Sequence, residues 1–126
     1  MVKRMLSSLL NQKLLPTNII VIDDASPMKI DLSDFIHKKV QLEKSKKRHG
    51  PAFSRNLGAR IALEEGFNVI VFSDYDLFFP RNWIWILNQA LRQNSGDLLS
   101  GVNLAFGETW WDWYHEMTLS LWATHT

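Results

Sequence analysis

Short apolar runs alternate with longer amphipathic segments along this chain. The runs Ile19-Ile20-Val21-Ile22 and Val69-Ile70-Val71-Phe72 are β-branched or aromatic and are too short for an ordinary helix. Each run therefore predicts a strand that is buried on both faces of a sheet. Val40-Gln41-Leu42 alternates between apolar and polar residues and predicts another short strand, and residues 97–104 predict a fourth.

Helical periodicity occupies three further segments. Apolar residues recur at helical spacing over residues 2–12, 53–65 and 81–93, so each segment predicts a helix with one buried face. Gly66 follows the second segment and suits the left-handed residue that ends many helices. Strands that alternate with helices in this way favour an α/β fold, with a mostly parallel sheet and helices on both of its faces. Residues 1–126 are interpreted as a single domain.

Composition narrows the class of protein. Of the 126 residues, 46% are hydrophobic and 21% are charged, which is typical of a folded globular chain. The formal net charge of +1 gives no support for nucleic-acid binding, and the lack of cysteine excludes disulfides and thiolate metal sites. No apolar stretch approaches the roughly 18 residues of a membrane span. We expect the protein in the cytoplasm, or at the cytoplasmic face of a membrane.

Carboxylates follow two of the predicted strands. Asp23 and Asp24 end the first apolar run, and Asp74 and Asp76 come after the run that ends at Phe72. Ligands of open α/β sheets bind at the carboxyl ends of the strands. An Asp-x-Asp pair there supplies hard oxygen ligands that suit Mg²⁺ or Mn²⁺ and, through the metal, a diphosphate. The alternative is that these residues only form turns, because aspartate is common where strands end.

A basic loop, residues 43–51, precedes the second predicted helix. Charge runs usually form solvated surface, and this interpretation is preferred for Lys44 and Lys46. For residues 47–49 the sequence leaves two alternatives open, which are solvated surface and a basic lip beside a bound phosphate.

Four segments in order carry a family resemblance. They are Leu6–Gln12, Ile19–Ser26, Gly50–Ala59 and Val69–Asp76, and Pro80 and Trp83 extend the last of them. Together they resemble the first helix, the acidic-pair strand, the Arg-Asn helix start and the Asp-x-Asp strand of the family 2 glycosyltransferases. The resemblance covers residues 5 to about 93. It implies the Rossmann-like, nucleotide-binding half of a GT-A fold, in a chain truncated at both ends that lacks the family's first strand.

The resemblance also implies roles for individual residues. Asp24 would accept hydrogen bonds from a uracil-type base, Arg55 would lie near the base and the diphosphate, and Asp74 would contact the ribose or the surroundings of a metal. Asp76 would bind a Mn²⁺ or Mg²⁺ ion that bridges the diphosphate. The implied activity is sugar transfer from a nucleotide-diphosphate sugar, with a UDP-sugar as the favoured donor, to an unknown sugar, lipid or protein acceptor. A divalent cation would stabilise the charge that develops on the leaving diphosphate.

Two other classes of function fit part of the pattern. Receiver domains of signalling proteins also place an acidic pair after one strand and a single aspartate after a later one, as Asp23, Asp24 and Asp74 do here. Alternatively, the tryptophan-rich stretch at 110–122 could make a catalytically inactive fragment an interaction module. The catalytic residues stay unknown, and Asp112 and Glu116 are the late carboxylates that could act as a base.

Overall fold

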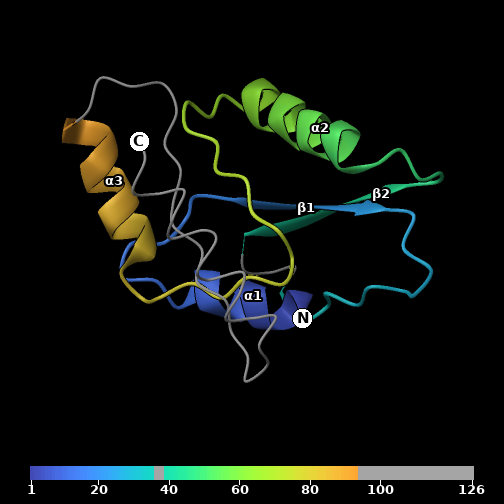
Figure 1. Cartoon of the computed structure of the whole chain (residues 1–126), viewed down its shortest axis with the longest axis horizontal. Helices are drawn as coiled ribbons and strands as arrows, with labels where there is room; N and C mark the ends of the chain where they lie inside the picture. Colours follow the sequence, from blue (N-terminus) through green and yellow to red (C-terminus); the bar gives the residue numbers. More distant parts are fainter. Residues whose placement is uncertain (36–38, 94–126) are drawn as a thin grey trace, which may run out of the picture. The chain divides into compact units, whose positions relative to one another are not determined.

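The computed structural model describes residues 1–35 and 39–93. By its contacts the chain divides into two compact units, Met1–Gln89 and Ala90–Thr126. Five elements are described, and their bounds are α1 Val2–Leu10, β1 Ile19–Asp24, β2 Val40–Ser45, α2 Pro51–Glu64 and α3 Trp83–Gln93 (Figure 1). The three predicted helices and two of the predicted strands are therefore confirmed, with ends that shift by up to three residues. The strand expected at 97–104 lies outside the described residues.

The described sheet consists of β1 and β2, which pair in parallel with Ile19 opposite Val40 and Asp24 opposite Ser45. Alternate side chains of a strand point to opposite faces. On one face, Val21 and Leu42 pack against the core cluster, to which α1 contributes Met5 and Leu6. On the other face, Ile22 meets α2 at Gly58. Helices thus cover both faces of this parallel pair, as the sequence predicts, and Figure 1 shows α1 and α2 on opposite sides of the strands.

The core lies between α1, the sheet and the segment that precedes α3. Leu6 of α1 is fully buried, and Leu32 from the connection between the strands is 2% exposed. The buried residues of this cluster are Met5, Leu6, Leu32, Phe35, Val40 and Phe79. The ring of Phe79 lies 4.5 Å from that of Trp83, so the start of α3 packs against the same cluster.

The strand predicted at residues 68–72 is wrong. This segment forms no strand in the structure, and Val69, Val71 and Phe72 are 59%, 48% and 55% exposed. Its composition is that of a strand, but a strand also requires a neighbour for its backbone hydrogen bonds. Within the described residues β1 pairs with β2 alone, and the segment has no such neighbour.

Two adjacent hydrogen bonds end α2 at Gly66. The Gly66 amide donates to the carbonyl of Leu63 at 3.0 Å, and the Phe67 amide donates to that of Ala62 at 3.0 Å. With φ of +83° at Gly66, this is a Schellman motif, in which glycine avoids the steric cost of a left-handed residue. The sequence prediction of Gly66 as the residue that ends the helix is confirmed.

Replacing Gly58 with alanine is expected to stabilise the fold by up to about 1 kcal/mol, the helix-propensity difference between the two residues. A Cβ at this position would lie 3.6 Å from Ile22 Cγ1, which is an ordinary contact. Urea denaturation measures the change in the free energy of unfolding. Gly66→Ala is the matched control and should destabilise by about 1 kcal/mol because of its positive φ. A loss of stability in Gly58→Ala would contradict the contact described here.

Candidate functional site

Asp24 ties the end of β1 to the start of α2. Its carboxylate accepts hydrogen bonds from the backbone amides of His49, at 3.0 Å to each oxygen, and of Gly50 at 2.7 Å. The Gly50 amide, followed by that of His49, lowers the pKa of Asp24 below its usual value. The neighbouring Asp23 has a different role, because its carboxylate accepts from the Ser26 amide at 2.9 Å and closes the turn after β1. Of the acidic pair, Asp24 is the one that reaches α2.

The hydrogen bonds around His49 fix which ring nitrogen carries a proton. The Ser45 hydroxyl donates to the carbonyl of Lys47 at 2.7 Å, so it accepts from the second partner, His49 Nδ1, at 3.1 Å. Nδ1 therefore carries the hydrogen, and it also lies 3.5 Å from Asp24 Oδ1. The other ring nitrogen, Nε2, forms no hydrogen bond to another described residue. His49 thus turns Nδ1 toward Asp24 and Ser45, and Nε2 is its other ring nitrogen.

The ring of Phe53 stacks on that of His49, with centroids 4.2 Å apart and planes 23° from parallel. Phe53 is the first residue of the apolar pattern at 53–65, and it is 41% exposed. Its aromatic neighbour is therefore His49 of the basic loop. Lys44 and Lys46 are exposed, which agrees with solvated surface.

Arg55 and Asp74 form an ion pair with 2.9 Å between Arg55 Nη2 and Asp74 Oδ1. Arg55 lies on α2, about one turn after the His49 and Gly50 amides that bind Asp24. The ion pair therefore joins the start of this helix to the segment that contains Asp74. The two side chains are 50% and 64% exposed, and a pair this open contributes only about 0–1 kcal/mol to stability. The structure therefore brings together two of the residues that the sequence singled out, and leaves their contact free to rearrange.

Asp76 is exposed and forms no hydrogen bond or ion pair with another described residue. It lies in the turn at residues 75–76, two positions after Asp74. The structure brings Asp24, His49, Phe53, Arg55 and Asp74 to one end of α2, and Asp76 adjoins this group through the chain. Sequence reasoning left His49 open and did not select Phe53 as a site residue, although their positions beside Gly50 could have indicated the site.

A Mg²⁺ or Mn²⁺ ion at this turn would have to take most of its ligands from outside the described residues. The described residues contain no group of three or more acidic or histidine side chains that could hold a metal by themselves. Magnesium sites at phosphates commonly use one or two carboxylates, with phosphate oxygens and water completing the octahedron. Asp74 is already paired with Arg55, so Asp76 is the carboxylate of this turn that would contact a cation first.

Acid is expected to weaken the fold through Asp24. Because its folded-state pKa lies below the usual 3.8, its stabilisation is complete above about pH 3.8 and is lost as the pH falls through the lower folded-state value. Asp24→Asn should flatten this part of the stability profile, measured by urea denaturation between pH 2 and pH 6. Asp31→Asn is the comparison, because hydrogen bonds from Ser33 also lower the pKa of Asp31. If the stability of Asp24→Asn fell with pH as steeply as that of the parent, the hydrogen bonds from the His49 and Gly50 amides would not explain the loss in acid.

Some predicted features lie outside the described residues. Asp112 and Glu116, the two late carboxylates, are among them, and so is the tryptophan-rich stretch at 110–122. Over residues 1–35 and 39–93, no helix is long and apolar enough to cross a membrane.

Comparison with known proteins gives one match. The family model described as glycosyl transferase family 2 matches residues 1–125. Neither the search of curated proteins nor that of solved structures finds a significant match. The matched range contains every residue of the site described above, and it gives no support to the receiver-domain alternative.

Proposed function

The chain belongs to glycosyl transferase family 2, so its kind of enzyme is a glycosyltransferase, and from this premise we propose that it binds a nucleotide-diphosphate sugar where β1 meets α2. A UDP-sugar is the favoured donor, and the acceptor is a sugar, a lipid or a protein. The observation that carries the proposal is the Arg55–Asp74 ion pair, which gathers at one end of α2 two side chains that match the family's pattern.

Arg55 is proposed to bind the diphosphate. Its guanidinium has five N–H donors in a planar fork, and the contact with Asp74 engages one nitrogen, Nη2. The remaining donors suit phosphate oxygens, which arginine binds strongly in a bidentate manner. Because the pair is half exposed and weak, a diphosphate could compete with Asp74 without a large cost in stability.

Asp24 is proposed to accept a hydrogen bond from the base, within a limit set by its present partners. An ionised carboxylate offers about four lone-pair positions. Three contacts from the amides of His49 and Gly50 already use most of them, and His49 Nδ1 lies 3.5 Å from Oδ1. A base N–H would therefore have at most one position and would compete with His49 Nδ1 for it. This limit favours a single hydrogen bond from a pyrimidine imide over a larger contact with a purine.

The metal is proposed to lie at Asp76, with Asp74 beside it. A bound Mn²⁺ or Mg²⁺ would neutralise charge on the diphosphate as the bond to the sugar breaks. In the transfer, an acceptor hydroxyl oxygen forms a bond to the anomeric carbon, the nucleoside diphosphate leaves with the bonding electrons, and the hydroxyl proton passes to a base. The residue that acts as this base is not assigned.

Calorimetric titration of UDP into the protein, with and without Mn²⁺, tests the proposal. We expect binding only with the metal, and Arg55→Ala should weaken it about tenfold, as is typical when a charge-assisted hydrogen bond is lost. Arg60→Ala is the matched control, because Arg60 is an exposed arginine on the same helix. No UDP binding by a folded sample, or equal weakening by the two variants, would contradict the proposed donor site.

A further inference from the structure

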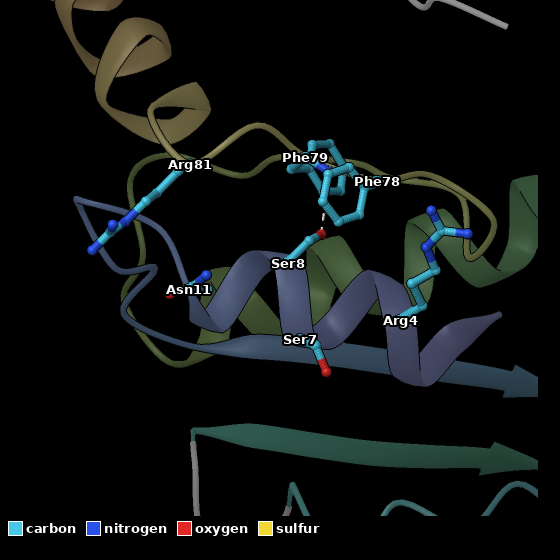
Figure 2. Close-up of a pocket in the computed structure, with 7 residues that line it drawn as sticks. All are labelled: Arg4, Ser7, Ser8, Asn11, Phe78, Phe79 and Arg81. Carbon is cyan, nitrogen blue, oxygen red and sulfur yellow. Dashed lines mark hydrogen bonds between the residues drawn. The ribbon is translucent and has the colours of Figure 1, made fainter. Parts of the chain in front are cut away.

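A cavity lies between α1 and the segment that leads into α3. Its volume is about 230 Å³, and it is lined by residues of α1 and of positions 78–81. Figure 2 shows Arg4 beside Phe78 at one end, and Arg81 with Asn11 at the other. None of these residues belongs to the site at Asp24, Arg55 and Asp74, so this cavity is a separate feature of the molecule.

Hydrogen bonds hold the two walls of this cavity together. The Ser8 hydroxyl, on a residue that is 6% exposed, donates to the carbonyl of Met5 at 2.7 Å and accepts from the Phe79 amide at 3.2 Å. The Lys13 amide donates to the carbonyl of Arg81 at 2.8 Å. The positions of both walls are therefore fixed before any ligand arrives, which reduces the entropic cost of binding.

The lining combines positive charge with an exposed aromatic ring. Arg4 Cζ lies 5.5 Å from the centroid of the Phe78 ring, and Phe78 is 48% exposed. The lining contains two arginines and no carboxylate, and neither arginine forms an ion pair within residues 1–35 and 39–93. The charge of this cavity is thus about +2, opposite to the −1.5 to −2 of a phosphate monoester at pH 7.

From this charge, this ring and this size, we propose that the cavity binds a small organic phosphate, with its phosphate at Arg4 and its apolar part against Phe78. The guanidinium fork matches phosphate oxygens, and Arg81 at the far end adds attraction. The volume is below the roughly 300–1,000 Å³ of drug-sized ligand sites, so it suits one ring or a short apolar group. A soluble aryl phosphate and the headgroup region of an anionic phospholipid share this chemistry.

An NMR titration of the full chain with phenyl phosphate tests the proposal. We expect shifts of the Ser8 and Phe79 amides, and weaker binding of inorganic phosphate, which lacks the ring. Arg4→Gln should weaken phenyl phosphate binding about tenfold and Arg81→Gln less, whereas Arg60→Gln on α2 should leave it unchanged. Equal affinity in Arg4→Gln and the parent, or shifts confined to the start of α2, would overturn the proposal.

Two further experiments complete the test. One identifies the source of the ligand, and the other shows whether this cavity is independent of the proposed donor site. Co-sedimentation with phosphatidic acid in phosphatidylcholine vesicles, lost in Arg4→Gln, would identify a lipid headgroup, and phenyl phosphate binding without co-sedimentation would identify a soluble phosphate. Failure of both probes would refute the site. UDP binding with Mn²⁺ should be the same in Arg4→Gln and the parent, so a failure of the donor site would be seen separately.

Discussion

Asp76→Ala is expected to abolish metal-dependent UDP binding and to leave the fold intact. Asp76 is the carboxylate of the Asp-x-Asp turn without a cationic partner among the described residues, whereas Asp74 is held by Arg55 at 2.9 Å. A divalent ion on a diphosphate often has only one or two protein carboxylates, so the loss of one removes much of its binding site. Because the side chain is exposed and makes no contact with the core, stability should change by no more than about 0.5 kcal/mol.

Calorimetry with Mn²⁺ and UDP measures the first effect, and urea denaturation measures the second. Glu64→Ala is the matched control, because Glu64 is an exposed acidic residue at the end of α2, away from the carboxyl ends of the strands. It should bind UDP as the parent does. Mn²⁺-dependent UDP binding of equal strength in Asp76→Ala and the parent would refute the assignment of the metal to this residue.

Gln12→Ala is expected to destabilise the protein by about 3 kcal/mol. The Gln12 side chain is 6% exposed and donates to the carbonyls of Pro80 at 2.7 Å and Ser8 at 3.0 Å. Its oxygen accepts from the Ile84 amide at 3.0 Å. Alanine would leave the Ser8 carbonyl and the Ile84 amide without this partner, whereas the Pro80 carbonyl would keep the Trp83 amide at 3.0 Å. Each buried group that loses its only hydrogen bond costs roughly 1–3 kcal/mol.

Urea denaturation measures this loss, and two variants separate its causes. Gln12→Met keeps most of the volume and removes the hydrogen bonds, so it should lose nearly as much stability as Gln12→Ala. Gln41→Ala removes a glutamine that bonds to Glu43 within β2 and should cost less than about 1 kcal/mol. If Gln12→Met were as stable as the parent, the hydrogen bonds to the segment at 80–84 would not hold this part of the fold.

Local patterns predict the helices and the paired strands well, because their information lies within a few residues. The apolar spacing of α1 and the glycine after α2 each specify a structure without distant partners. The runs at Ile19–Ile22 and Val40–Leu42 form strands because each provides the other with a neighbour. The segment at 68–72 shows the limit of this reasoning. Its composition predicts a strand, but a strand forms only beside another, and composition does not say which neighbour is present.

The candidate site was predicted in part. Family resemblance selects Asp24, Arg55, Asp74 and Asp76, and the structure adds the contact between Arg55 and Asp74. The family resemblance does not predict that amides of the basic loop occupy most of the Asp24 carboxylate. A hydrogen bond across 25 residues leaves no periodic signal in the sequence. Gln12 is similar, since its partners lie about 70 residues further along the chain.

That long separation has a consequence for how the chain folds. The hydrogen bonds of Ser8 and Gln12 to residues 79–84 close loops of 68 to 72 residues, and contacts this distant in sequence form late and slow folding. A ribosome adds roughly 5–20 residues per second, so the partners of α1 follow it by several seconds. During that time the face of α1 that carries Leu6 has only the earlier part of its core, Leu32, Phe35 and Val40, and lacks Phe79. We expect newly made chains to expose this face and to be most prone to aggregation before residue 84 is available.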